Sequence, residues 1–236
     1  MTKGRQTAIG LVLAVAILCS WAALQFAGAR LVALEGPGLM LAPFLVLAIC
    51  WLDVGLFIIA HDAMHGSLAP GRPWLNRLVG RVALAAYGGF VYDRLVPKHF
   101  AHHRHPGSEE DPDFHAADPR AFLAWYYAFF RRYFGLRELA GMTLLAAIYL
   151  FVLGGPVANM LLFWALPSLL SSLQLFLFGT WLPHRHADRQ FEDRHRARSS
   201  GYPWLLSLLS CFHFGYHLEH HRAPNLPWWR LPSARA

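Results

Sequence analysis

The sequence predicts an all-α integral membrane protein with four transmembrane helices and a cytoplasmic helical cap carrying a histidine-rich di-metal site. Three observations lead to this prediction. The 236-residue chain is 56% hydrophobic and only 15% charged, and its apolar residues are gathered in long runs. Two of the segments that connect these runs contain only one basic residue between them. Its 14 histidines all lie outside the runs, most of them in short motifs.

The apolar runs are expected to cross the bilayer as two helical hairpins. The first, second and fourth reach the roughly 20 residues that a spanning helix needs, whereas the third is shorter and marginal alone. Asp53 is the only charged residue within the second run. The length of the chain predicts a single domain over residues 1–236. The four expected spans are approximately residues 7–27, 39–60, 139–154 and 157–182.

A cleaved signal peptide is the alternative for the first run. Lys3 and Arg5 provide a charged start, and the small residues at 27–29 resemble a cleavage site. The apolar stretch is longer than the roughly 7–15 residues of a signal-peptide core, and its removal would leave an odd number of spans. We therefore expect it to remain as a membrane helix.

The positive charge follows the membrane segments. The formal net charge is +7, yet Arg30 is the only basic residue between the first two runs, and none lies between the last two. This asymmetry predicts that both termini and the polar segments face the cytoplasm. Because the basic residues flank membrane segments, nucleic-acid binding is not expected. Residues 75–92 and 120–135 are expected to lie along the membrane surface, and Trp228 and Trp229 fit an aromatic anchor there.

Three histidine boxes follow the runs on the predicted cytoplasmic side. The first has the spacing HxxxH, and the other two repeat HxxHH, which places three imidazoles on one side of a helix. Eight imidazoles exceed the four ligands of one zinc site, so two metal ions are implied. The eight predicted ligands are His61, His65, His99, His102, His103, His217, His220 and His221.

The identity of the metal is narrowed by the position of these ligands. Nitrogen ligands alone allow zinc, copper or iron. A membrane metal-binding or transport protein is one alternative, but transport favours polar ligands at the middle of the membrane. Here the ligands lie at the helix ends, where an apolar substrate can enter from the bilayer. Oxygen chemistry on an unactivated C–H bond suits that arrangement and favours iron.

The stretches HDAMHGSL, HFAHHRHPG, DPDFH, FGTWLPHRHAD, RSSGY and CFHFGYHLEHH resemble the membrane fatty-acid desaturase/hydroxylase superfamily. Within it, they are most similar to the bacterial β-carotene ketolases, or carotenoid 4-oxygenases. The likeness runs from about residue 39 to the C-terminus. The boxes are common to the superfamily, whereas the intervening stretches distinguish a ketolase from a carotenoid hydroxylase or an acyl-lipid desaturase, which remain alternatives.

The resemblance implies two Fe²⁺ ions, O₂ as co-substrate, an electron donor such as ferredoxin, and a location in the bacterial cytoplasmic membrane. Its substrate would be a carotenoid from the bilayer, oxidised at C4 of the β-ionone ring. Two successive hydroxylations there yield a gem-diol that loses water to a ketone. β-Carotene would give echinenone and then canthaxanthin, and zeaxanthin would give astaxanthin.

Further residues near the boxes are expected to complete the site. A ninth ligand is expected after the fourth run, and we favour His184 over His186 because it comes first and follows Pro183, where the helix should end. His213, one turn before His217, is expected to face the same metals as a ligand or as a partner of one.

Carboxylates in or beside the boxes are additional candidates. The candidates for orienting imidazole N–H groups are Asp62, Glu219, Asp111 and Asp113, with an ordinary solvated charge as the alternative. Asp62 and Glu219 are also candidates for additional metal ligands. Asp53 lies two turns before the first box, so it is expected to line the substrate tunnel. The alternative for Asp53 is an interhelical hydrogen bond to Gln174 or to a serine of the fourth run.

Overall fold

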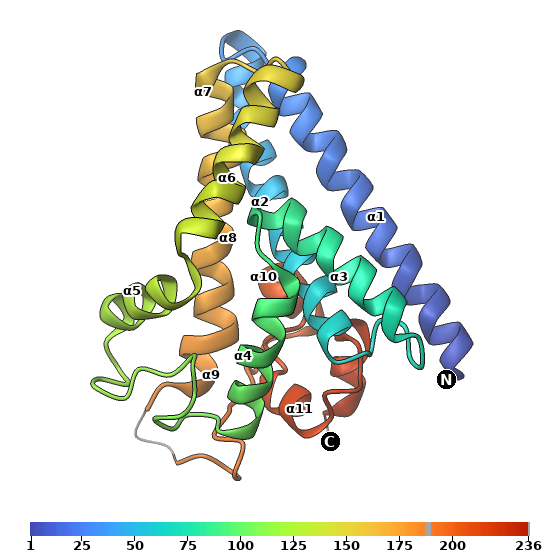
Figure 1. The fold of residues 1–236 in the computed structure, drawn as a ribbon, viewed down its shortest axis with the longest axis vertical. Coiled ribbons are helices and arrows are strands. Elements are labelled where there is room, and N and C mark those ends of the chain that lie inside the picture. The colour runs from blue at the N-terminus through green and yellow to red at the C-terminus, as the bar shows by residue number, and fades with distance from the viewer. Residues whose placement is uncertain (187–189, 236) are drawn as a thin grey trace.

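The computed structural model describes residues 1–186 and 190–235, and helices connected by loops account for its regular secondary structure in that part of the chain (Figure 1). The prediction of an all-helical chain is confirmed for these residues. The helices of the first half are α1 (Lys3–Arg30), α2 (Gly36–Met64), α3 (Pro73–Gly88), α4 (Tyr92–Arg104), α5 (Phe122–Tyr133) and α6 (Leu136–Ala147).

The second half contains short helices that partly join end to end. Three of them are π-helical turns, which widen an otherwise α-helical rod. In chain order these elements are η1 (Ile148–Val152), α7 (Val157–Met160), η2 (Leu161–Ala165), α8 (Leu166–Phe176), η3 (Leu177–Trp181), α9 (Leu182–His184), α10 (Trp204–Cys211), α11 (His217–Arg222) and the 3₁₀ helix η4 (Trp228–Ala234).

Three helices of the described chain are long and apolar enough to cross a membrane: α1, α2 and the continuous rod Val157–His184. The third expected span, 139–154, falls in the shorter helix Leu136–Val152, which meets α5 at a bend of 84°. A fourth span results when this bent pair is counted as one crossing. The bend explains why the third apolar run is short: its neighbour α5 turns away from it at Phe134 and Gly135.

The expected surface helices are amphipathic in the structure. α3 buries Ala83 and Leu84 and exposes Trp74 and Leu78 on its other side. α5 buries only Trp125. Apolar side chains on the outer face of a helix suit the boundary between lipid and water. The membrane-surface location of both helices remains a prediction.

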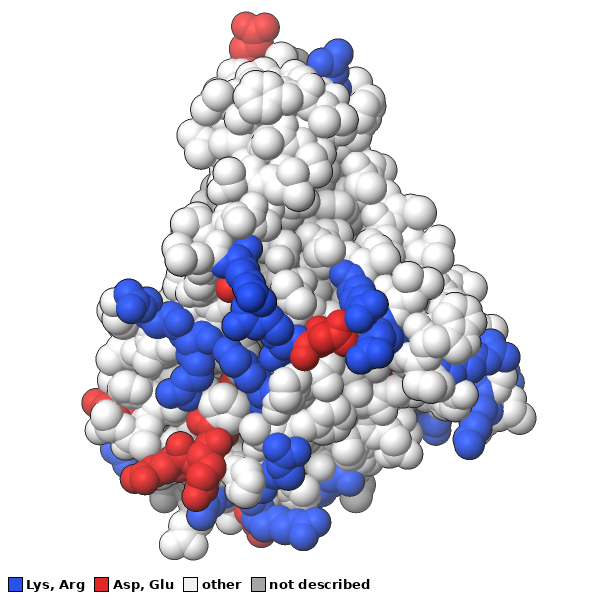
Figure 2. All heavy atoms as spheres, in the orientation of Figure 1, with Lys and Arg blue, Asp and Glu red and all other residues white. Residues whose placement is uncertain are grey.

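The molecule is narrow at one end and broad at the other (Figure 1). α1, α2, the α6 rod and the rod that contains α8 run along its length, whereas α4, α9 and α11 gather at the broad end. In Figure 2 the Lys, Arg, Asp and Glu side chains cover the middle and the broad end, and the tapering part is almost free of them. This separation matches the apolar runs and the polar segments of the sequence.

The C-terminal segment packs against the lower half of α2. Leu52 to Met64 of α2 are buried except for Phe57, which is partly exposed. The ring of Phe212 stacks on Trp51 of α2 with centroids 4.2 Å apart. Gly55 permits this approach, because a Cβ there would lie 2.8 Å from Phe212. This contact brings the third histidine box next to the first.

Candidate metal centre

Nine histidines converge at the broad end of the fold, in two adjacent groups. Within each group the candidate ligand atoms all lie within 4.8 Å of one another. The first group contains His61, His65, His99, His103 and His220. The second group contains His102, His184, His217 and His221. These are the eight box histidines and the histidine favoured as the ninth.

The spacing of the boxes distributes the imidazoles between the two groups. On α4, His99 and His103 lie at i and i+4 and join the first group, whereas His102 turns to the second. α11 shows the reverse division, with His217 and His221 in the second group and His220 in the first. The two HxxHH helices therefore contribute to both groups.

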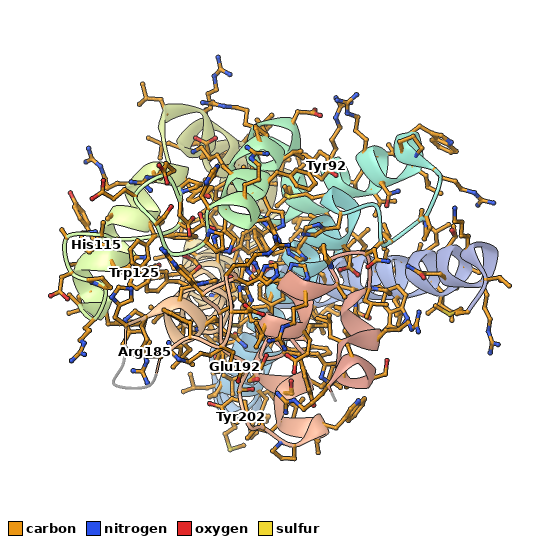
Figure 3. The ribbon with its side chains drawn as sticks, turned by 90° about the horizontal axis from the view of Figure 1, so that it is seen from below. Tyr92, His115, Trp125, Arg185, Glu192 and Tyr202 are labelled. Carbon is orange, nitrogen blue, oxygen red and sulfur yellow. The ribbon has the colours of Figure 1, made fainter. Side chains whose placement is uncertain are left out.

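The two groups touch each other. The rings of His103 and His221, one from each group, stack with centroids 4.3 Å apart. Figure 3 looks onto this end of the molecule, with Trp125 of α5 on one side, Tyr202 of the C-terminal segment on another, and nitrogen-bearing side chains crowded between them. Such proximity suits a dinuclear centre.

The distances between ring nitrogens fit ligands that share a cation. In the first group the Nε2 atoms of His103 and His220 are 3.1 Å apart, and in the second those of His217 and His221 are 3.1 Å apart. Two ligands at about 2.1 Å from one metal, at roughly 90–110° to each other, are about 3.0–3.4 Å apart. Both ring nitrogens of His61 are buried without a hydrogen-bond partner in the described chain. A bound metal would satisfy such a nitrogen.

Burial keeps most of these imidazoles in the form that binds metal. Burial, reinforced by neighbouring histidines, lowers the pKa of His65 to about 4 and holds the pKa of His99 and His220 well below the usual value. A neutral imidazole offers its lone pair to a metal without first losing a proton. The donor set therefore suits a transition metal with nitrogen ligands.

His102 has a different environment. Burial disfavours its charged form, but the hydrogen bond and the charge of Asp111 outweigh this effect and raise its pKa. Both carboxylate oxygens of Asp111 lie 3.0 Å from Nδ1 of His102. The expectation that Asp111 orients an imidazole is confirmed. Asp113 lies farther from that nitrogen, at 3.8 Å, and accepts a hydrogen bond from the hydroxyl of Tyr133.

Asp62 and Glu219 do not contact box imidazoles through hydrogen bonds. Asp62 is buried and accepts a hydrogen bond from the backbone N–H of Trp228, while its carboxylate is 3.8 Å from the His61 ring. Glu219 pairs with Ser199 and Arg235. Each carboxylate anchors the C-terminal segment, and the expectation that they orient imidazoles stays a prediction.

His213 is not part of either group, and the premise for placing it there is wrong. α10 ends at Cys211, and Phe212 and His213 take positive φ angles of 46° and 63°. The chain therefore reverses before α11 begins, so His213 is not one turn before His217 on the same helix. Its buried ring lies beside Trp204, with centroids 5.1 Å apart.

His184 and His186 differ clearly in the structure. His184 is 1% exposed, and its Nδ1 pairs with the carbonyl oxygen of Arg196 while Nε2 faces the second group. His186 is exposed and its ring lies near Phe114. Helix α9 ends between them, as Pro183 suggested.

Asp53 is not among the residues that line the cavity at the histidines. Its carboxylate accepts a hydrogen bond of 2.8 Å from the indole of Trp21 on α1. The expected alternative partner, Gln174, instead accepts from Cys50 and donates to the carbonyl oxygen of Ser210. The interhelical hydrogen bond expected as the alternative is therefore present, but it comes from α1, which packs against the face of α2 that carries Asp53.

An apolar cavity of about 260 Å³ ends at the two histidine groups. Its walls come from α2, α3, α4, α5, α6, the α8 rod and the C-terminal segment. The residues that line it are Phe57, His61, Met64, Tyr87, Gly88, Phe90, Leu95, His99, His102, His103, Asp113, Phe129, Phe130, Tyr133, Phe134, Met142, Ala165, Ser168, Leu169, Ser172, Leu175, Gly179, Thr180, Phe214 and His217.

The contribution of α5 to this cavity was missed by the sequence reasoning, which treated residues 120–135 as structural. Phe129, Phe130 and Tyr133 lie in the wall. Their signal in the sequence was the aromatic run itself, which has the same composition as a membrane-surface helix. Only the bend after Tyr133 turns one side of α5 towards the histidines.

Comparison with known proteins agrees with this centre. A family model described as fatty acid desaturase matches residues 36–146 and 136–236. The chain is 48% identical to a β-carotene ketolase of Paracoccus sp. (strain N81106 / MBIC 01143), over 100% of this chain and 96% of that protein. It is 39% identical to a zeaxanthin 4-ketolase of Chlamydomonas reinhardtii, over 78% of this chain and 42% of that protein. The chain therefore belongs to the fatty acid desaturase family, in which its similarity to the Paracoccus ketolase extends over its whole length.

Proposed function

We propose that this chain is a carotenoid 4-ketolase, an enzyme that converts C4 of a β-ionone ring into a carbonyl. The observation that carries the proposal is the apolar cavity that ends at two adjacent histidine groups. A hydrocarbon ring would fit such a wall, and at the histidine end one of its C–H bonds would lie next to the proposed metal centre. The similarity to proteins named β-carotene ketolase and zeaxanthin 4-ketolase supports the choice of substrate.

The nine histidines of the two groups would hold two Fe²⁺ ions. The fit rests on converging, buried ring nitrogens and on Asp111, which fixes the orientation of His102. Bound iron would supply the activation of O₂ that oxidation of an unactivated C–H bond requires. The protein supplies the ligands, the dry cavity and the orientation of the ring.

The cavity is smaller than the roughly 300–1,000 Å³ of typical small-molecule sites. A carotenoid is much longer than such a space, so only one ring and the adjoining part of the polyene would enter. Phe129, Phe130 and Phe214 present aromatic surface to this ring. Excluding water from the cavity protects the reaction from side products.

Two rounds of oxidation at one carbon would give the ketone. Each round replaces one C4–H bond by C4–OH, consuming one O₂ and two electrons with two protons and releasing one water. The resulting gem-diol loses water to form the carbonyl. β-Carotene would give echinenone and then canthaxanthin, and zeaxanthin would give astaxanthin. A donor such as ferredoxin would deliver the electrons.

The protein would sit in the bacterial cytoplasmic membrane as one domain with four spans, the bent α5–α6 pair forming one of them. Both termini and the histidine groups would face the cytoplasm. The concentration of Lys and Arg at the broad end supports this orientation, because basic residues favour the cytoplasmic side (Figure 2).

The test is expression of this chain in cells that accumulate β-carotene. Chromatography with mass detection should show echinenone and canthaxanthin, each ring exchanging CH₂ for C=O. Carotenoids bearing only 3-hydroxyl groups would identify a hydroxylase, and unchanged carotenoids with a newly unsaturated acyl chain would identify a desaturase. Bound metal without oxygen consumption would favour a metal-binding protein.

A further inference from the structure

The cavity wall contains several hydroxyl groups, and all but one are bonded within the protein. Ser168 donates to the carbonyl oxygen of Trp164, and Ser172 pairs with Tyr126. Tyr133 donates to Asp113, and Tyr87 is hydrogen-bonded to Ser171. Because these hydroxyls already have partners within the protein, they are not available to bond to a ligand in the cavity.

Thr180 differs from these residues. It is only 6% exposed, it lies in the cavity wall, and its hydroxyl has no hydrogen-bond partner among the residues that the structure describes. The hydroxyl oxygen of Thr180 is not fully enclosed by protein atoms. Part of its surface therefore remains accessible from the cavity. A buried hydroxyl without a partner is costly, and the cost is recovered when a ligand bonds to it.

The local backbone explains why this hydroxyl is free. A helical threonine commonly bonds to a carbonyl oxygen one turn earlier. Thr180 lies in the π-helical turn η3, whose widened backbone changes the position of those carbonyls. Such turns are frequent at functional sites. The free hydroxyl is therefore a consequence of a specific distortion of the α8 rod.

Thr180 lies at the histidine end of the cavity. It precedes His184 by four residues on one continuous helix, so the two side chains occupy the same side of that rod. His217, which shares the cavity wall with Thr180, has its Nε2 2.9 Å from that of His184. A ligand atom near Thr180 is consequently near the second histidine group.

We infer that Thr180 binds the oxygen that the first oxidation places on the ring, and so retains the 4-hydroxy carotenoid for the second oxidation. The inference rests on the proposed function. An unsubstituted hydrocarbon ring has no group for Thr180, whereas the 4-hydroxyl both donates and accepts. The hydrogen bond would keep the alcohol from leaving and would hold its remaining C4–H bond towards the histidine end.

The first test compares Thr180→Val, which keeps the shape and removes the hydroxyl, with Thr180→Ser, which keeps the hydroxyl. In cells that accumulate β-carotene, Thr180→Val should raise the ratio of 4-hydroxy to 4-keto carotenoid roughly fivefold, the effect of one lost hydrogen bond. Thr180→Ser should restore the wild-type ratio. Thr143→Val is the matched control, since Thr143 is exposed on α6 and bonds to the carbonyl oxygen of Leu139.

The second test measures binding to iron-loaded protein without oxygen, by the shift of the carotenoid absorption band. Thr180→Val should bind 4-hydroxy-β-carotene roughly fivefold more weakly than wild type, with β-carotene affected much less.

An unchanged product ratio in an active Thr180→Val would overturn the inference and leave the proposed function intact. Equal loss of all oxidation in the Val and Ser variants would show that Thr180 only contributes to packing. If Thr180→Val weakened the binding of 3-hydroxy carotenoids alone, Thr180 would not bind the oxygen on C4, and the inference would be overturned. Absence of any 4-oxygenated product from wild type would remove the proposed function and this inference together.

Discussion

Both carboxylate oxygens of Asp111 lie 3.0 Å from Nδ1 of His102, whose Nε2 lies 3.2 Å from that of His221. Asp111 thereby holds the proton on Nδ1 and leaves Nε2 free towards the second histidine group. The carboxylate is itself held by the backbone N–H groups of Gly107 and Asp113, each at 2.8 Å. The orientation of one proposed ligand thus depends on the loop that follows α4.

Asp111→Asn should weaken metal binding by the second histidine group by about 10–100-fold, because it removes the charge that orients His102. Titration of metal-free protein with Fe²⁺ under anaerobic conditions measures this effect. Glu110→Gln is the matched control, since Glu110 is exposed and its carboxylate accepts a hydrogen bond from the Ser108 hydroxyl. Equal affinity in the Asn variant and the wild type would contradict the orienting role.

Ala at any of the eight box histidines should abolish ketone formation while leaving insertion into the membrane intact. Each change removes a proposed ligand and leaves the apolar runs unaltered. Elemental analysis should give about two irons per chain in the wild type and about one in His65→Ala or His217→Ala, which affect different groups. Full activity in His61→Ala would contradict the dinuclear proposal, and zinc in place of iron would favour a different class of protein.

His184→Ala should reduce activity by at least about 100-fold, the scale expected when a ligand of a metal centre is lost. His186→Ala should stay near the wild-type activity, because its exposed ring contacts neither histidine group in the described chain. Conversion of β-carotene in expressing cells, normalised to the amount of protein in the membrane, measures both. A larger defect in His186→Ala than in His184→Ala would reverse the assignment.

Gly55→Ala should destabilise the protein by about 1–3 kcal/mol, the usual cost of overpacking a core. The added Cβ would lie 2.8 Å from the Phe212 ring and 3.1 Å from Ile17, so the C-terminal segment would have to move away from α2. Thermal unfolding in detergent should show a lower Tm. Gly4→Ala is the control, because nothing lies within 4 Å of a Cβ at that position. An unchanged Tm for Gly55→Ala would show that the contact is not tightly packed.

Local pattern was enough to predict the long helices and all nine proposed ligands. Hydrophobic runs of the required length mark α1, α2 and the rod Val157–His184, since a spanning helix needs about 20 apolar residues whatever surrounds it. The HxxHH spacing places three imidazoles on one side of α4 and of α11 because 3.6 residues make a helical turn. Pro183 marked the end of α9 and so distinguished His184 from His186.

Other features depended on contacts between distant segments, which a one-dimensional pattern does not contain. Asp53 pairs with Trp21 because α1 packs on that face of α2. Nothing in the sequence around a carboxylate within an apolar run indicates which residue will be its partner. His213 lies outside the two histidine groups because two successive residues with positive φ angles reverse the chain before α11. The bend of 84° after α5 turns its aromatic side chains into the cavity wall.

The sequence by itself determined that this chain is helical, apolar enough for a membrane, and supplied with histidines that could hold metal. Only the tertiary structure decided how those histidines divide, with five in one group and four in the other. The physical reason is that helical periodicity sets which residues share one side of a helix. Which side meets which neighbour is set by the packing of α2, α4, α9 and α11 together.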